Sequence, residues 1–216
     1  MKAMIVATLS VVSALSLGSG PRGHKTIRYE ISFQNITHKM VLTPPIFSLS
    51  RDQIDVYQLG QPATVSLEML AEGGATDALR TDFEAAGVQD LVQMDMPVLP
   101  GATATATLEG DKASRLNLAS MLLPTNDGFV AMNGPRVFSF SGEQVFMLRA
   151  YDAGTEDNDE LCTSIPGPQC GGTGFVEGGG EGFVAPHRGT HGGGDLSPMM
   201  YSWGEPVAIV TVRVVH

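Results

Sequence analysis

Alternation of apolar and polar residues is the first strong pattern in the chain, and it begins directly after Thr26. Large apolar side chains occupy every second position, as Ile27, Tyr29, Ile31 and Phe33. Successive side chains of a strand point to opposite faces, so this period of two predicts a half-buried β-strand. The same period returns over residues 102–108, where alanines and Leu108 alternate with threonines. A second half-buried strand is therefore expected there.

Four further segments carry strand patterns. Residues 116–123 form an apolar-rich run. Residues 137–140 and 143–150 are expected to form a strand pair, because Ser141-Gly142 between them is typical of a hairpin link. Residues 206–215 are rich in Val and Ile, which predicts a strand that is buried on at least one face.

Residues 66–87 follow a different period. Apolar residues recur there at intervals of three or four, which predicts one or two short helices: Leu67, Leu70, Ala71, Leu79, Phe83 and Ala86. Gly73-Gly74 separates the two halves, and Gly87 lies where a helix C-cap is expected.

Strands spread along the whole chain, with turn residues between them, predict an all-β fold, an antiparallel β-sandwich with one or two short helices. Strands do not alternate with long helices, which disfavours a doubly wound α/β fold. Residues 25–216 are expected to form one domain. Residues 152–206 hold most of the glycines and little apolar periodicity, so we expect a long ordered loop there.

The first twenty residues are typical of a secretory signal peptide. A Lys at position 2 precedes an uncharged apolar stretch, and small residues follow at positions 18–20. The stretch is short for a membrane span, which needs about 20 apolar residues. We therefore expect residues 1–20 to be a signal peptide cleaved somewhere in 18–24, and an exported mature chain without a transmembrane segment, in the periplasm or outside the cell.

Charge and cysteine content refine this picture. Lys and Arg number 13 against 23 Asp and Glu, giving a net charge of −10, which argues against nucleic acid as a partner. Cys162 and Cys170 are the two cysteines of the chain. In an oxidising compartment, their spacing is most simply explained by one local disulfide that closes a loop.

Two acidic turns carry the candidate chemistry. One contains Asp127, in Asn126-Asp127-Gly128, and the other runs from Tyr151 to Glu160. Gly154 allows the second turn to fold back, so that Asp152 and Glu156 can point at one place. With Asp127 they can supply part of the oxygen shell of Ca²⁺, which takes roughly 6–8 oxygens. From spacing alone, a solvated acidic loop without an ion remains an open alternative.

Several separated stretches resemble the spondin N-terminal domain family, most closely its single-domain bacterial form. They are LAEGGATDALRTDFEAAG from residue 70, NLASMLLPTNDGFVAMNG from residue 117, and YDAGTEDNDE from residue 151. The opening YEISFQNIT, the Pro44-Pro45 pair and the closing PVAIVTVRV also fit. The resemblance covers residues 27–215 and keeps the motifs in order.

The resemblance implies a β-sandwich related to C2 domains, with one Ca²⁺ near the loops at one end. The three acidic ligands of the family fall on Asp127, Asp152 and Glu156. At Glu156 the animal relatives have Asp, so the reach of this ligand differs. The additional domains and cysteines of the animal proteins are not found here, and their matrix and cell-surface roles do not transfer directly.

Three functions follow as alternatives. The first is a calcium-binding module that recognises a protein or glycan at a surface, as in adhesion, without catalysis. The second is a metal-dependent hydrolase that uses the same acidic site, and the third is a purely structural envelope protein. His187, His191 and Asp195 have the spacing of a metal-binding helix face, but the glycines around them make a helix implausible. We expect a flexible loop with incidental histidines there.

Overall fold

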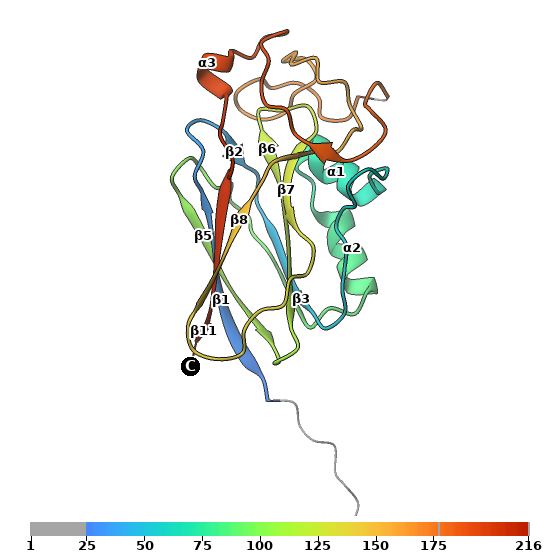
Figure 1. The fold of residues 1–216 in the computed structure, drawn as a ribbon. Helices are drawn as coiled ribbons and strands as arrows, with labels where there is room; N and C mark the ends of the chain where they lie inside the picture. Colours follow the sequence, from blue (N-terminus) through green and yellow to red (C-terminus); the bar gives the residue numbers. More distant parts are fainter. Residues whose placement is uncertain (1–24, 177, 216) are drawn as a thin grey trace, which may run out of the picture.

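Two antiparallel β-sheets packed face to face form the body of the protein (Figure 1). The computed structural model describes residues 25–176 and 178–215, and the predicted signal peptide lies outside them. The smaller sheet has the strand order β5-β1-β11-β8. Its strands are β1 (Ile27–Asn35), β5 (Thr103–Gly110), β8 (Glu143–Leu148) and β11 (Ala208–Val215). The predicted β-sandwich is confirmed.

The larger sheet has the order β10-β9-β7-β6-β3-β4, and β2 pairs additionally with β6. Its strands are β2 (Val41–Leu42), β3 (Ile46–Ser50), β4 (Asp90–Gln93), β6 (Arg115–Leu123), β7 (Gly128–Met132), β9 (Tyr151–Asp152) and β10 (Ala185–Pro186). Every strand pairing in both sheets is antiparallel.

Two short helices cover the outer face of the larger sheet (Figure 1). They are α1 (Val65–Gly73) and α2 (Asp77–Ala85), where sequence periodicity predicted helices. Gly74 ends α1 in a left-handed conformation at φ 69°, and its amide bonds back to the carbonyl of Leu70. A third short helix, α3 (Pro198–Tyr201), lies at the loop end of the sandwich.

The helices explain why the central strands of the larger sheet show no alternation. Their side chains pack into the sandwich core on one face and against the helices on the other. All five residues of β3 and all five of β7 are therefore buried. In the smaller sheet, β1 keeps one face in the core and one face outward, so alternation predicted it correctly.

The hairpin predicted from residues 137–140 and 143–150 is wrong. Strand β8 pairs with β11 instead, and residues 137–140 form no strand. The side chain of Gln144 accounts for the difference, because its carbonyl accepts from the Phe138 amide and its own amide donates to the Arg136 carbonyl. These side-chain bonds replace the backbone ladder that a hairpin requires.

The Cys162–Cys170 disulfide predicted from the sequence is confirmed. It lies in the segment that follows β9, and Cys170 packs beside a small apolar cluster under that segment. In the part of the chain that is described, no helix has the length and apolar character needed to cross a membrane.

Candidate metal centre

The two acidic turns predicted from the sequence lie beside each other at one end of the sandwich. Strand β9 pairs with β7, and this pairing sets Asp152 opposite Gly128. Because Asp127 directly precedes Gly128 in the turn between β6 and β7, its carboxylate comes close to that of Asp152. Sheet register therefore joins two acids that are separated by 24 residues in the chain.

Asp127 is fully buried. Its Oδ2 accepts hydrogen bonds from the backbone amides of Thr155 at 2.7 Å and Glu156 at 3.2 Å. Its Oδ1 is buried without any hydrogen-bond partner. Burial, followed by repulsion from Asp152, raises the pKa of Asp127 to about 7, against the lowering effect of the two amides.

Asp152 organises the turn that follows it. Its Oδ1 accepts from the amide of Gly154 at 2.8 Å, a bond that folds the backbone back two residues later. Its Oδ2 accepts from the side-chain amide of Asn158 at 2.7 Å. The side chain is almost fully buried, so a second carboxylate is held close to Asp127.

Glu156 is also buried but points toward other partners. Its Oε1 accepts from the amide of Val176 at 3.0 Å, and its Oε2 lies 3.5 Å from the side-chain amide of Asn126. Burial raises the pKa of Glu156 to about 7, with smaller contributions from Glu72 and Asp127. Glu156 thus adds a third acid to the same electrostatic neighbourhood.

The unpartnered oxygen of Asp127 allows a test of whether a hard cation fits here. A buried carboxylate oxygen without a donor, next to a second carboxylate, has the chemistry of a Ca²⁺ ligand. Asp127 and Asp152 fit such an ion. Over residues 25–176 and 178–215, no three His, Cys, Asp or Glu side chains converge closely enough to enclose an ion. In the present arrangement, Glu156 lies in the adjoining turn with its carboxylate bonded to Val176.

Glu72 is an acid at this site that sequence reasoning missed. It lies near the C-terminal end of α1, is buried, and its Oε1 has no hydrogen-bond partner. Burial raises the pKa of Glu72, while contacts with Thr155 and Glu156 lower it. Nothing in the helical spacing distinguishes Glu72 from the more exposed Glu68, so burial of this acid becomes visible only in the fold.

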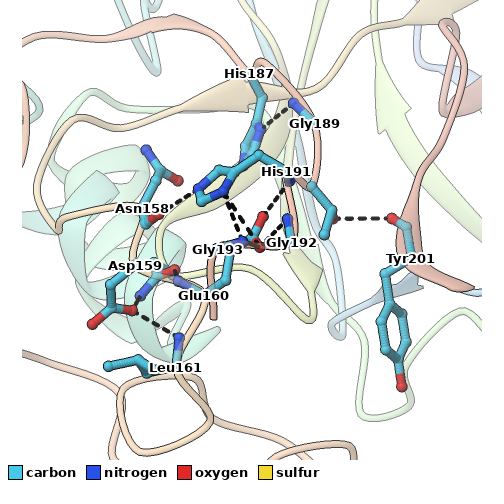
Figure 2. A network of polar contacts seen from close by, with 12 residues as sticks. Asn158, Asp159, Glu160, Leu161, His187, Gly189, His191, Gly192, Gly193 and Tyr201 are labelled. Atoms are coloured by element: carbon cyan, nitrogen blue, oxygen red, sulfur yellow. Dashed lines mark hydrogen bonds and ion pairs between the residues drawn. The ribbon is translucent and has the colours of Figure 1, made fainter. Parts of the chain in front are cut away.

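Glu160 is the second missed acid, and it fixes the loop that returns past the site. Figure 2 shows its carboxylate beside the backbone of residues 191–193. It accepts from the amides of His191 at 2.5 Å, Gly192 at 2.6 Å and Gly193 at 3.1 Å. Glu160 itself has φ 56°, a conformation that non-glycine residues rarely adopt. The three amides offset the cost of this conformation, and the loop expected to be flexible is anchored instead.

Asn126 connects the two acidic turns directly through its side chain. The side-chain oxygen Oδ1 accepts from the backbone amide of Glu160 at 3.2 Å, and Nδ2 donates to the Asp159 carboxylate at 2.9 Å. Asn126 is buried, so these bonds are shielded from water. The turn that carries Asp127 therefore cannot move independently of the segment that carries Asp152 and Glu156.

A pocket of about 170 Å³ opens beside the acids, and His187 lines it with Asp152 and Arg188. Nδ1 of His187 accepts from the Gly189 amide at 3.0 Å, while Nε2 is buried without a partner. The ring stacks edge-on against Trp203. Burial lowers the pKa of His187 to about 4, so the imidazole is neutral at physiological pH. As expected, residues 187–195 form no helix.

The raised pKa values predict how pH affects the metal-free chain. In the folded state, Asp127 and Glu156 have pKa values of about 7, against roughly 4 in an unfolded chain. Between these values the folded state binds more protons, so the free energy of unfolding falls as pH rises from about 4 to 7. Urea unfolding of the chelator-treated chain over this range measures the slope. A free energy that rises through the interval would contradict the assignment.

The family model described as Spondin_N matches residues 44–164, which contain α1, both acidic turns and all three predicted ligands. Among curated proteins, no sequence matches the chain. The matched region spans more than half of the chain, and the protein therefore belongs to the spondin N-terminal domain family.

Proposed function

We propose that this protein is an exported calcium-binding module that recognises a protein or glycan at a cell surface and performs no catalysis. One observation carries the proposal, which is the buried Oδ1 of Asp127, unpartnered and next to the Asp152 carboxylate. A buried negative charge without a donor is costly unless a cation or a proton neutralises it. Near neutral pH, with a pKa of about 7, a proton neutralises Asp127 only in part.

The proposed ligands are Asp127, Asp152 and Glu156. The first two are supported by their adjacency, and Glu156 is supported by its burial in the turn whose backbone amides hold Asp127. Ca²⁺ suits this set, because carboxylate and carbonyl oxygens are its preferred ligands and its geometry is adaptable. The ion would supply charge neutralisation and order in the two turns, and the chain itself would present the binding surface.

The proposed recognition surface is an apolar rim formed by Phe175, Val176 and Phe183, all of which are exposed. Each of them is tied to the site. The Val176 amide bonds to Glu156, the ring of Phe175 lies against Gly73 at the end of α1, and the backbone of Phe183 lies against Gly154. Exposed apolar residues gathered around ordered loops are typical of interaction sites.

The chemistry of the two nearby histidines supports recognition rather than hydrolysis. His187 has a pKa lowered to about 4, which makes it a weak general base near neutral pH. Nε2 of His191 is within 2.8 Å of the Asn158 carbonyl, so this nitrogen is engaged by backbone. The disulfide between Cys162 and Cys170 supports an oxidising compartment, consistent with the periplasm or the cell exterior.

Thermal unfolding in the presence of chelator, Mg²⁺ or Ca²⁺ tests the proposal. An ion that binds only the folded state at a hundredfold excess over Kd stabilises by about 2.7 kcal/mol. For a chain of this size, we expect a Ca²⁺-selective rise in Tm of roughly 5–10 °C. Asp152→Asn keeps the shape of the side chain and should abolish most of this rise.

Asp157→Asn is the matched control, because Asp157 is exposed in the same acidic loop. This variant should retain the full response to Ca²⁺. An equal response in Asp152→Asn and Asp157→Asn would show that Ca²⁺ acts through general screening of the acidic surface. No response in the unmodified chain would refute calcium binding and leave the acids as a proton-binding cluster.

A further inference from the structure

Strand β8 ends the smaller sheet and leaves one edge of that sheet open. Among the residues that the structure describes, β11 is its only strand partner in that sheet. The Leu148 carbonyl accepts from the Val207 amide, just before β11, so the backbone of Leu148 faces that neighbour. Backbone groups alternate in direction along a strand, and those of Glu143, Val145 and Met147 therefore face the open edge.

This edge lacks the devices that usually prevent strands from pairing between molecules. Strand β8 contains no proline, and no charged side chain points inward from it. At the opposite edge of the same sheet, on β5, the carboxylate of Asp90 accepts from the Glu109 amide and so occupies a backbone donor. The two edges thus differ, and β8 is the edge open to addition.

The outward side chains of β8 and the residue after it read Glu143, Val145, Met147, Arg149, and all four are exposed. Exposure is 54% for Val145 and 70% for Met147, high values for apolar residues in a strand. This order is its own complement when it is read in the opposite direction, with an acid facing a base and apolar residues facing each other.

We propose that β8 pairs antiparallel with β8 of a second copy of this chain, about a two-fold axis at Phe146. In this register Val145 faces Met147 of the second copy, and Glu143 faces Arg149 of the second copy. The facing residues are all ones whose backbone groups point to the open edge, so they form hydrogen bonds with each other directly. The smaller sheets of the two copies become one continuous sheet.

The charges determine the register of the pairing, and they favour a second copy of this chain as the partner strand. Arg149 makes no ion pair with any residue in the described ranges, while Glu143 lies 3.6 Å from Arg213. Pairing at Phe146 gives each Arg149 a carboxylate across the axis. Moving the two-fold axis by one residue, to Val145 or to Met147, places Val145 opposite Val145 or Met147 opposite Met147. Either move removes the match between Glu143 and Arg149.

The inner side of the edge also has room for the second strand. A groove of about 440 Å³ runs between β8 and β7, and Met132, Asn133 and Phe146 are among the residues that line it. Phe146 is partly buried and packs at the margin of the core. At the axis the two Phe146 side chains face each other as a non-hydrogen-bonded pair, the closer of the two pair types.

Two double variants, studied by sedimentation equilibrium, test the pairing. Val145→Lys with Met147→Glu places opposite charges across the axis in the proposed register and like charges in both shifted registers. Val145→Glu with Met147→Glu differs from it by one residue and places like charges across the axis twice. Both positions are exposed, so both variants should fold.

We expect the unmodified chain to show a concentration-dependent dimer and the Lys/Glu variant to retain it. The Glu/Glu variant should dimerise at least about tenfold more weakly, since like charges in facing positions are unfavourable. Amides of Val145 and Met147 should also exchange more slowly with solvent as protein concentration rises. A chain that is monomeric at millimolar concentration, or a dimer equally strong in both variants, would overturn the proposal.

Discussion

Replacing Gly154 by Ala is expected to lower the free energy of unfolding by about 3 kcal/mol or more and to weaken the calcium response. Gly154 has φ 70°, which L-residues rarely adopt. A Cβ there would also overlap the carbonyl oxygen of Phe183 and lie 2.8 Å from its amide nitrogen. Because both contacts are backbone, only movement of the loop can relieve them. That movement would carry Asp152 and Glu156 away from Asp127.

Gly182→Ala is the control for this effect. Gly182 belongs to the same loop, has φ 78°, and has no atom within 4 Å of the added Cβ. Gly182→Ala should lower the free energy of unfolding only by the cost of placing Ala at positive φ, roughly 1–2 kcal/mol. Urea unfolding and calcium titration of both variants distinguish this cost from the cost of the steric clash at Gly154. Equal losses in the two variants would show that the approach of Phe183 to Gly154 does not restrict the loop.

Replacing Asp127 by Asn is expected to change stability in opposite directions with and without calcium. Without the ion, the variant should be more stable than the unmodified chain above about pH 7, on the order of 2 kcal/mol, because a buried charge is removed. Its amide oxygen can still accept from Thr155 and Glu156, and its new N–H group can donate toward Asp152. With saturating Ca²⁺, only the unmodified chain should gain stability, and it should then be more stable than Asp127→Asn.

Chemical unfolding at two pH values, with chelator or with Ca²⁺, measures this reversal. At about pH 5 the carboxyl of Asp127 is already protonated, so the two chains should then differ little without the ion. Asp157→Asn, at an exposed position, should follow the unmodified chain in every condition. A variant that is less stable without calcium would show that the Asp127 charge is compensated within the protein.

Sequence periodicity predicted the elements whose two faces differ. Strand β1 and helices α1 and α2 each have one buried and one more exposed side, and all three could be read from spacing. Strand β3 was missed because every one of its residues is buried between core and helices. No alternation exists in such a strand, and only its position between β4 and β6 identifies it.

The acids of the candidate site that lie in short turns could be predicted from the sequence. The acids that belong to the site only because the fold buries them could not. Asp127 and Asp152 lie next to glycine-containing turns, and their side chains come together as the order of strands requires. Glu72 and Glu160 are acids of ordinary appearance in the sequence. One is buried because α1 packs against the larger sheet, and the other because three amides from a distant loop surround it.

The glycine-rich segment has a structural explanation that composition alone did not provide. Gly178, Gly179 and Gly182 adopt positive φ, and a Cβ on Gly180 would collide with the backbone of Gly154. The Gly182 amide donates to the Gly154 carbonyl at 2.8 Å. Two needs therefore account for these glycines: at Gly154 and Gly180 the two backbones pass too closely for a side chain, while Gly178 and Gly182 supply a positive φ in open space.

The neighbouring positions of β1 and β11 determine how the domain would respond to mechanical force. Arg28 faces Val215, so the first and last strands are adjacent and antiparallel, and their outer ends lie together at the end of the sandwich opposite the acidic loops (Figure 1). Tension applied at these two ends would act across the strands and load the hydrogen bonds between them one after another, in an unzipping geometry. A domain attached through both of these ends would yield at low force, and the strand ends farthest from the acidic loops would separate first.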